Sequence, residues 1–130
     1  DFTQPTAIGT HIKADHPQLK FAEPKQGGFD FNWALDAKGD VSKLAADVHD
    51  PQSGRRLQLY TTEPGVQFYT SNFLDGTIKG KHGKVYPHWG AFTLETQHYP
   101  DSPNQPNFPS TRLDPGQTYT QTMVLKFSAQ

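Results

Sequence analysis

A carboxylate at the end of a short alternating segment is the first candidate for chemistry in this chain. Glu95 closes an apolar/polar alternation and is followed by a polar, proline-rich stretch over residues 96–109. A strand fixes the direction of a side chain, and the loop after it shapes a pocket, so such a position suits a reactive group. Carboxylates are also commonly solvated or paired. The residue types alone leave both interpretations of Glu95 open.

Two further polar side chains could bind a hydroxylated ligand. Asp30 lies two residues after the pair Gly27-Gly28. An ionised carboxylate is a strong hydrogen-bond acceptor, but an aspartate after two glycines is also typical of a turn. Gln67 carries an amide that both donates and accepts, or it is an outward-facing strand residue. Trp33 and Trp89 could stack on a sugar face, but core packing is the more common role of such residues.

Other catalytic chemistries find little support in the spacing of residues. There is no close His-x-His pair, no His-Glu-x-x-His and no Gly-x-Ser-x-Gly, so neither a metal site nor a nucleophile elbow is predicted. Residues 80–84 resemble a phosphate loop in composition only, and we interpret them as an exposed turn. Zero cysteines exclude disulfides and thiolate chemistry and leave the compartment open. The histidines, interpreted as surface or loop residues, are His11, His16, His49, His82, His88 and His98.

The elements that must position these side chains are short strands. Eleven glycines and eleven prolines spread along 130 residues argue against long helices and predict an all-β protein. Apolar side chains alternate over 56–61, 91–96 and 118–127, which predicts three strands. Turn residues at 37–40 and 51–54 divide a predicted meander over 35–60. The irregular segments 75–89 and 99–116 are long enough to line a site.

Length and charge limit the possible partners. A chain of 130 residues fits one domain, so we expect 1–130 to form a single unit. Twelve basic against thirteen acidic residues give a net charge of −1, which provides no footprint for nucleic acid or an anionic membrane. No apolar run reaches the roughly 20 residues that span a bilayer, and the first residues lack the character of a signal peptide.

Three segments together resemble the aldose 1-epimerases, also called galactose mutarotases. They are GGFDFNWAL at 27–35, TTEPGVQFYTSNFLDGT at 61–77 and LETQHYPDSPNQPNFP at 94–109, in that family's order. The resemblance runs from Asp1 to Phe127. It implies the C-terminal part of a large antiparallel β-sandwich, because the family is considerably longer. The family's upstream segments, including its catalytic histidine, have no counterpart here, so the resemblance implies an upstream segment or a companion polypeptide that supplies the acid.

The resemblance also implies a reaction and roles for the candidates. Mutarotation interconverts the α and β forms of a free hexose such as galactose or glucose by acid–base ring opening, without metal or organic cofactor. Glu95 matches the family's base, and Asp30 and Gln67 match residues that hold sugar hydroxyls. The partner is then a neutral aldohexose. This chain departs from the family at Phe31, where histidine is common, which removes a polar group beside Asp30.

Three alternatives accompany this interpretation. A hexose-6-phosphate epimerase of related fold would need clustered cations, for which Arg55 and Arg56 are candidates. A non-catalytic carbohydrate-binding or sensing module would keep the sugar contacts without the acid. A purely structural role would leave the three site-like segments unexplained.

Overall fold

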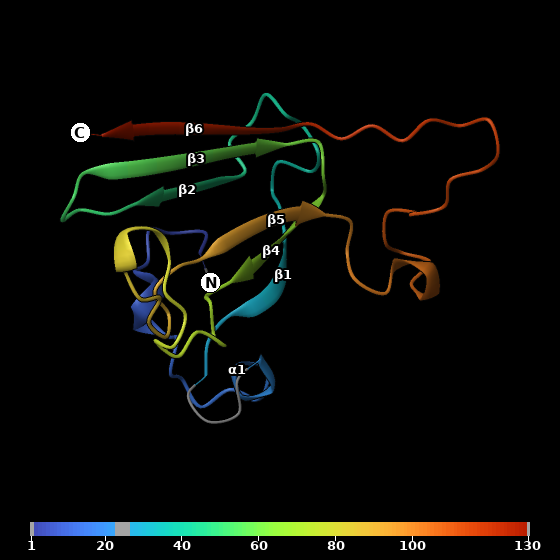
Figure 1. Cartoon of the computed structure of the whole chain (residues 1–130). Helices are drawn as coiled ribbons and strands as arrows, with labels where there is room; N and C mark the ends of the chain where they lie inside the picture. Colours follow the sequence, from blue (N-terminus) through green and yellow to red (C-terminus); the bar gives the residue numbers. More distant parts are fainter. Residues whose placement is uncertain (1, 23–26, 130) are drawn as a thin grey trace. The chain divides into compact units, whose positions relative to one another are not determined.

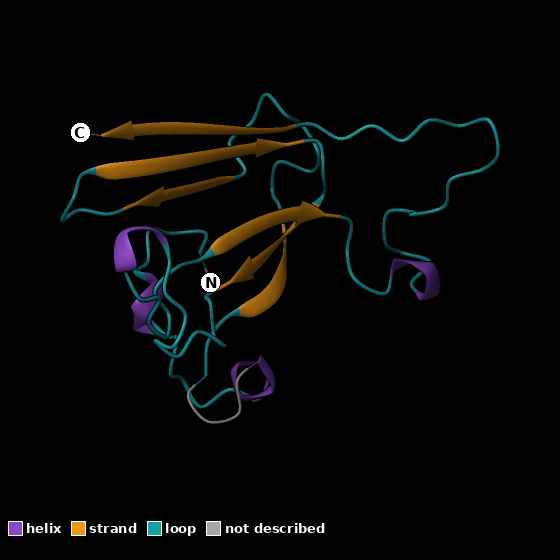
Figure 2. Ribbon diagram, in the orientation of Figure 1, coloured by secondary structure: helices purple, strands orange, loops and turns teal. Residues whose placement is uncertain are grey.

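The computed structural model describes residues 2–22 and 27–129, in which strands and turns predominate (Figure 2). The single α-helix of this part, α1, covers only Pro17–Ala22, beside the short 3-10 helices Ile8–Thr10, Lys81–Gly83 and Ser102–Asn104. The expectation of an all-β fold without long helices is confirmed. The chain divides into two compact units, residues 1–31 with 67–94 and residues 32–66 with 95–130. The expectation of one domain over 1–130 stays a prediction.

One antiparallel sheet lies entirely in the second unit, with strand order β2-β3-β6. Its strands are β2 (Ala46–His49), β3 (Arg55–Thr61) and β6 (Met123–Ala129), and Figure 1 shows β3 running between the other two. The predicted strand at 56–61 is therefore confirmed. Of the predicted meander over 35–60, the β2–β3 hairpin is present, whereas residues 35–45 lie in turns and irregular structure.

The turn between β2 and β3 is held by side chains as the sequence suggests. The carboxylate of Asp50 accepts hydrogen bonds from the backbone of Gln52 at 3.1 Å and from the Ser53 hydroxyl at 2.5 Å. Gly54 adopts φ +70°, a conformation that glycine reaches without steric cost. Aspartate and serine favour turns because they offer these local bonds.

β6 begins later than the alternation over 118–127 predicts, because side-chain hydrogen bonds replace much of the ladder before it, although the Thr62 N–H still donates to the Thr122 carbonyl at 3.0 Å. Thr122 donates its backbone N–H to the Thr62 hydroxyl at 2.9 Å, and Gln121 donates its amide to the Thr96 hydroxyl at 2.6 Å. Tyr119 points its hydroxyl at a carboxylate. Residues 118–122 are thus held in place without being a regular strand, and the ladder starts at Met123.

The other sheet has the order β1-β4-β5, with β1 (Asp30–Ala34), β4 (Gly65–Tyr69) and β5 (Thr93–Gln97). The predicted strand at 91–96 is present but starts two residues later. In the first unit the core is aromatic: Phe29 and Phe68 stack with ring centroids 5.3 Å apart, and Phe2 meets both rings edge-on.

A buried carboxylate organises the second unit. Glu63, in the turn between β3 and β4, is only 2% exposed. Its Oε1 accepts from the Tyr119 hydroxyl at 2.5 Å, its Oε2 lies 2.6 Å from His98 Nδ1, and its backbone N–H donates to the Thr61 hydroxyl. A carboxylate cut off from water needs such partners. Glu63 therefore joins three segments that are far apart in the sequence.

The hydrogen bond to Glu63 shifts the pKa of Tyr119. The hydrogen bond to Glu63, followed by burial and the charge of that carboxylate, raises the pKa of Tyr119 above its ordinary value of 10.0. The folded state therefore holds the phenolic proton more firmly than the unfolded chain does.

Replacing Glu63 by Gln should destabilise the fold by about 1–3 kcal/mol, because Tyr119 and His98 lose the charged acceptor that the buried carboxylate provides. The matched control is Asp47→Asn, which removes a carboxylate whose side chain is 26% exposed and paired with Arg56; an exposed pair contributes about 0–1 kcal/mol. Urea unfolding of both variants measures the difference. An equal loss of unfolding free energy in Glu63→Gln and Asp47→Asn would show that Glu63 is not the organising contact.

Tyr119→Phe should lower stability in a manner that depends on pH. Since the pKa of Tyr119 is raised by folding, its contribution is fully present below about pH 10, the unfolded value, and is lost as pH rises through the folded value. The difference in unfolding free energy between wild type and Tyr119→Phe should thus be constant from pH 7 to 9 and shrink above pH 10. Tyr86→Phe serves as control. A difference that grows at high pH would contradict the assignment.

Candidate active site

Asp30 and Gln67 meet in the first unit. Asp30 is the first residue of β1 and Gln67 is the central residue of β4, and both are half-buried. The Gln67 amide donates from Nε2 to Asp30 Oδ1 at 2.7 Å. An ionised carboxylate offers about four lone-pair sites, so this bond leaves capacity for further donors. Two side chains separated by 37 residues thus form one polar pair that suits hydroxyl groups.

The backbone just before Asp30 is clamped by buried polar groups. The Thr70 hydroxyl accepts from the Phe29 N–H at 2.9 Å and donates to Asn72 Oδ1 at 2.7 Å, while the Asn72 amide donates to the Phe29 carbonyl at 3.0 Å. A Cβ on Gly28 would collide with the Asn72 side chain, and φ there is +131°. Glycine is therefore required at 28. The hydrogen bonds around Phe29 fix the backbone just before β1 and so fix the position of Asp30, the first residue of that strand.

Glu95 belongs to the second unit. The prediction that Glu95 ends a strand is wrong, because β5 continues through Gln97 and Glu95 is its middle residue. Glu95 is exposed, whereas its neighbours Leu94 and Thr96 are half-buried. Two residues on, the Gln97 amide donates from Nε2 to Asn32 Oδ1 at 3.1 Å. A Cβ on Gly65 would lie 2.7 Å from that same Asn32 oxygen, so the absence of a side chain at 65 makes room for this polar pair.

The structure shows the surroundings of Phe31 and His98, which the sequence did not determine. The Phe31 ring packs edge-on against Phe29, with centroids 5.7 Å apart, so the residue beside Asp30 joins the aromatic core. His98, interpreted from the sequence as a surface or loop residue, is half-buried beside Glu63. The residues at 80–84 form a turn around the 3-10 helix Lys81–Gly83, whose three residues are exposed.

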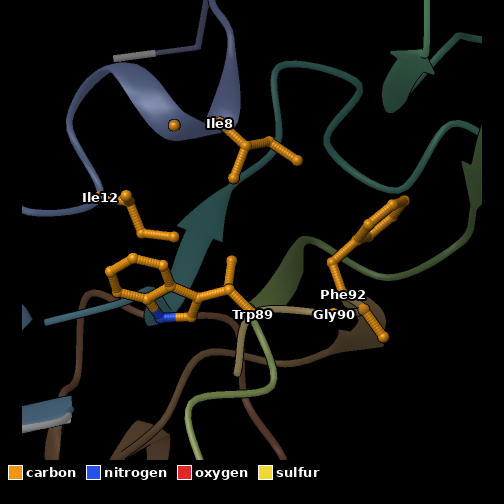
Figure 3. A pocket seen from close by; sticks show the side chains of 8 residues that line it. Ile8, Ile12, Trp89, Gly90 and Phe92 are labelled. Carbon is orange, nitrogen blue, oxygen red and sulfur yellow. The ribbon is translucent and has the colours of Figure 1, made fainter. Parts of the chain in front are cut away.

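An apolar pocket of about 350 Å³ lies in the first unit, and Figure 3 shows Trp89 and Phe92 among its walls. Trp89 is flanked by the His88 ring, at 4.3 Å between centroids, and by Lys13 Nζ, 5.1 Å from the ring centroid. The indole Nε1 is buried without a hydrogen-bond partner. Asp30 and Gln67 are not in the lining, which consists of Ile8, Gly9, Ile12, Thr70, Trp89, Gly90, Ala91 and Phe92.

Among residues 2–22 and 27–129, no group of three or more His, Asp or Glu side chains could hold a metal ion. None of the helices in the same ranges has the length and apolar character needed to cross a bilayer.

The sequence analysis missed two polar clusters: Glu63 with His98 and Tyr119, and the Thr70–Asn72 clamp. Glu63 lies next to a proline after a strand, a position that resembles an ordinary exposed turn. Only partners 35 and 56 residues away make its burial tolerable. The available signal was the run Thr61–Asn72, in which polar residues stand on both sides of the short apolar stretch that contains Val66, Phe68 and Tyr69.

Comparisons with known proteins identify the family of this chain. The family model described as aldose 1-epimerase matches residues 1–126. The chain is 49% identical to galactose mutarotase of Homo sapiens over 129 residues, covering 98% of this chain and 34% of that protein. It is 36% identical to aldose 1-epimerase of Escherichia coli (strain K12) over 132 residues, covering 100% of this chain and 36% of that protein.

A solved structure leads to the same family. The GalM/aldose epimerase homologue from C. elegans aligns with a TM-score of 0.68 at 31% identity, covering 78% of this chain and 30% of that one. The chain spans about a third of the length of the curated relatives it matches, and the matched part is their C-terminal portion. The chain belongs to the aldose 1-epimerase family.

Proposed function

We propose that this chain supplies the general base and the hydroxyl-binding side chains of a hexose mutarotase. The observation that carries the proposal is the Gln67–Asp30 hydrogen bond of 2.7 Å between two half-buried strand residues. The family membership of residues 1–126 supports it. Since relatives named galactose mutarotase are similar over 98% of this chain, the substrate proposed is a free aldohexose such as galactose or glucose.

Glu95 is proposed as the base. Its exposure gives a sugar access to the carboxylate, and β5 fixes the direction of the side chain. The carboxylate removes the proton of the anomeric hydroxyl, the ring oxygen gains a proton, the C1–O5 bond breaks, and C1 rotates before the ring closes on the other face. The proton for the ring oxygen comes from an acid outside this chain, in an upstream segment or a companion polypeptide.

Asp30 and Gln67 are proposed to hold hydroxyl groups of the sugar. The carboxylate accepts from hydroxyls in addition to Gln67, and charge makes those bonds stronger than neutral ones. Gln67 orients the carboxylate, and the clamp on Phe29 holds the strand beneath it. Such preorganisation reduces the entropy lost when the sugar binds.

Two of the three alternatives can be compared with the contacts in the structure. A phosphorylated sugar would need a cation, but the Arg56 guanidinium is already engaged by Asp47, with Nε 2.8 Å from Oδ1 and a second nitrogen 2.5 Å from Oδ2. This pairing disfavours Arg56 as a phosphate ligand. A non-catalytic sugar-binding module uses the same Asp30–Gln67 pair without the acid, and it is distinguished by binding without rate enhancement.

Glu95→Gln should lower catalysed mutarotation by about 10²–10⁴-fold, the usual contribution of a general base. The assay is polarimetry of α-galactose on a single chain in which the upstream region of Homo sapiens galactose mutarotase precedes this chain. Asp47→Asn is the control, because it neutralises another exposed strand carboxylate. Unchanged rates with Glu95→Gln would refute its role, and sugar binding without any rate in the parent chain would favour the module.

Gln67→Leu should weaken galactose binding about tenfold, because it removes the partner that orients Asp30 and leaves a polar ligand group unpaired. Gln58→Leu is the matched control, because Gln58 is also a half-buried strand residue whose amide donates to an aspartate. Its Nε2 lies 3.2 Å from Asp47 Oδ2. Titration of each variant with galactose, followed by NMR, gives the dissociation constants. The same weakening in both variants would mean that Gln67 has no special part in binding.

A further inference from the structure

Two amide side chains meet above the middle strand of the sheet β1-β4-β5. Asn32 lies in β1 and Gln97 in β5, and β4 runs between these strands. Since neighbouring strands lie about 4.8 Å apart, the backbones of β1 and β5 are separated by about twice that distance. The Gln97 amide nevertheless donates from Nε2 to Asn32 Oδ1 at 3.1 Å. Both side chains therefore lean over β4 toward each other.

Gly65 is the residue of β4 that permits this contact. A Cβ there would lie 2.7 Å from Asn32 Oδ1, 3.1 Å from Asn32 Nδ2 and 3.0 Å from the Tyr99 ring. Glycine inside a strand is destabilising, and the φ of Gly65 is not positive, so its backbone conformation does not call for glycine. The missing side chain therefore makes room for Asn32 and Tyr99.

The amide pair of Asn32 and Gln97 lies on the same face of β5 as Glu95. Glu95 and Gln97 are two residues apart in one strand, so their side chains share a face and are spaced about 6.8 Å along it. Glu95 is exposed, whereas Gln97 and Asn32 are half-buried. A pyranose ring with its hydroxyl groups spans a similar length. A sugar at the Glu95 carboxylate can therefore reach the amide pair.

Asn32 has donors available for such a ligand. Its Oδ1 accepts from Gln97, which fixes the plane of the amide. In residues 2–22 and 27–129 no group accepts from Asn32 Nδ2, and this nitrogen is not one of the enclosed side-chain atoms that lack a partner there. It is therefore accessible from solvent. An amide nitrogen of this kind donates two hydrogens, and the oxygen of a sugar hydroxyl accepts them.

We propose that Asn32 is a further sugar-binding residue, whose Nδ2 donates to a hydroxyl oxygen of the aldohexose while the anomeric hydroxyl faces Glu95. Gln97 is a positioning residue that acts through Asn32, because its hydrogen bond orients the amide before the sugar binds. The inference rests on the proposed function insofar as Glu95 is the base. A site that hydrogen-bonds one hydroxyl rejects the analogue that lacks it, so Asn32 contributes to the choice of sugar.

Asn32→Leu should weaken galactose binding about tenfold, because a sugar hydroxyl loses its donor. The titration is followed by NMR on the same fusion of the upstream region of Homo sapiens galactose mutarotase with this chain. Gln58→Leu is the matched control, because it removes another half-buried strand amide that donates a hydrogen bond to a neighbouring side chain. The control should leave galactose binding unchanged.

A panel of galactoses that each lack one hydroxyl tests the direct contact. For one sugar of the panel, the fused chain and its Asn32→Leu variant should bind with equal affinity, because the hydroxyl that Asn32 contacts is absent. For the other sugars the variant should still bind about tenfold more weakly. A structural role of Asn32 would instead weaken the binding of every sugar by the same factor.

Circular dichroism checks that the variants keep their strands, and Asn32→Ala replaces Asn32→Leu if that variant unfolds. Equal weakening by Asn32→Leu and Gln58→Leu, or the same weakening for every sugar of the panel, would overturn the proposal. The polarimetry of the fused chain separates the two proposals. Weaker binding by Asn32→Leu without mutarotation in the parent refutes the function alone, whereas mutarotation that depends on Glu95, with unchanged galactose binding in Asn32→Leu, refutes the Asn32 contact alone.

Discussion

The burial of one carboxylate governs the second unit. Glu63 is nearly inaccessible to water, and an unpaired buried carboxylate would cost several kcal/mol. Its two oxygens are therefore paired with Tyr119 and His98, which come from the segments that precede β6 and follow β5. This requirement holds both segments against the turn between β3 and β4.

The buried polar groups of the first unit also have hydrogen-bond partners. The clamp around Phe29 satisfies a backbone N–H, a carbonyl and two buried side chains at once. A network in which every member has a partner rigidifies the backbone it surrounds. Asp30 directly follows this rigid backbone and accepts a hydrogen bond from Gln67 on β4. A carboxylate and an amide therefore lie side by side on two strands, and no loop is needed to hold them.

Exposure divides the candidate residues into two kinds. Glu95 is exposed in the middle of β5, whereas Asp30 and Gln67 are half-buried and hydrogen-bonded to each other. β6 is exposed as well, but there exposure conflicts with the apolar alternation of Met123, Leu125 and Phe127. The exposure of Glu95 suits access of a small polar molecule.

Local patterns in the sequence determined the all-β class, the strand predicted at 56–61 and the turn predicted at 51–54, because alternation and turn chemistry depend on neighbours in the chain. They also singled out Asp30, Gln67 and Glu95 through a family resemblance. Tertiary structure alone decided that Gln67 bonds Asp30, that Glu63 is buried with His98 and Tyr119, that β6 starts at Met123, and that its apolar face is uncovered. These depend on contacts between residues tens of positions apart, and neither spacing nor propensity along the chain encodes which distant partner satisfies a buried polar group.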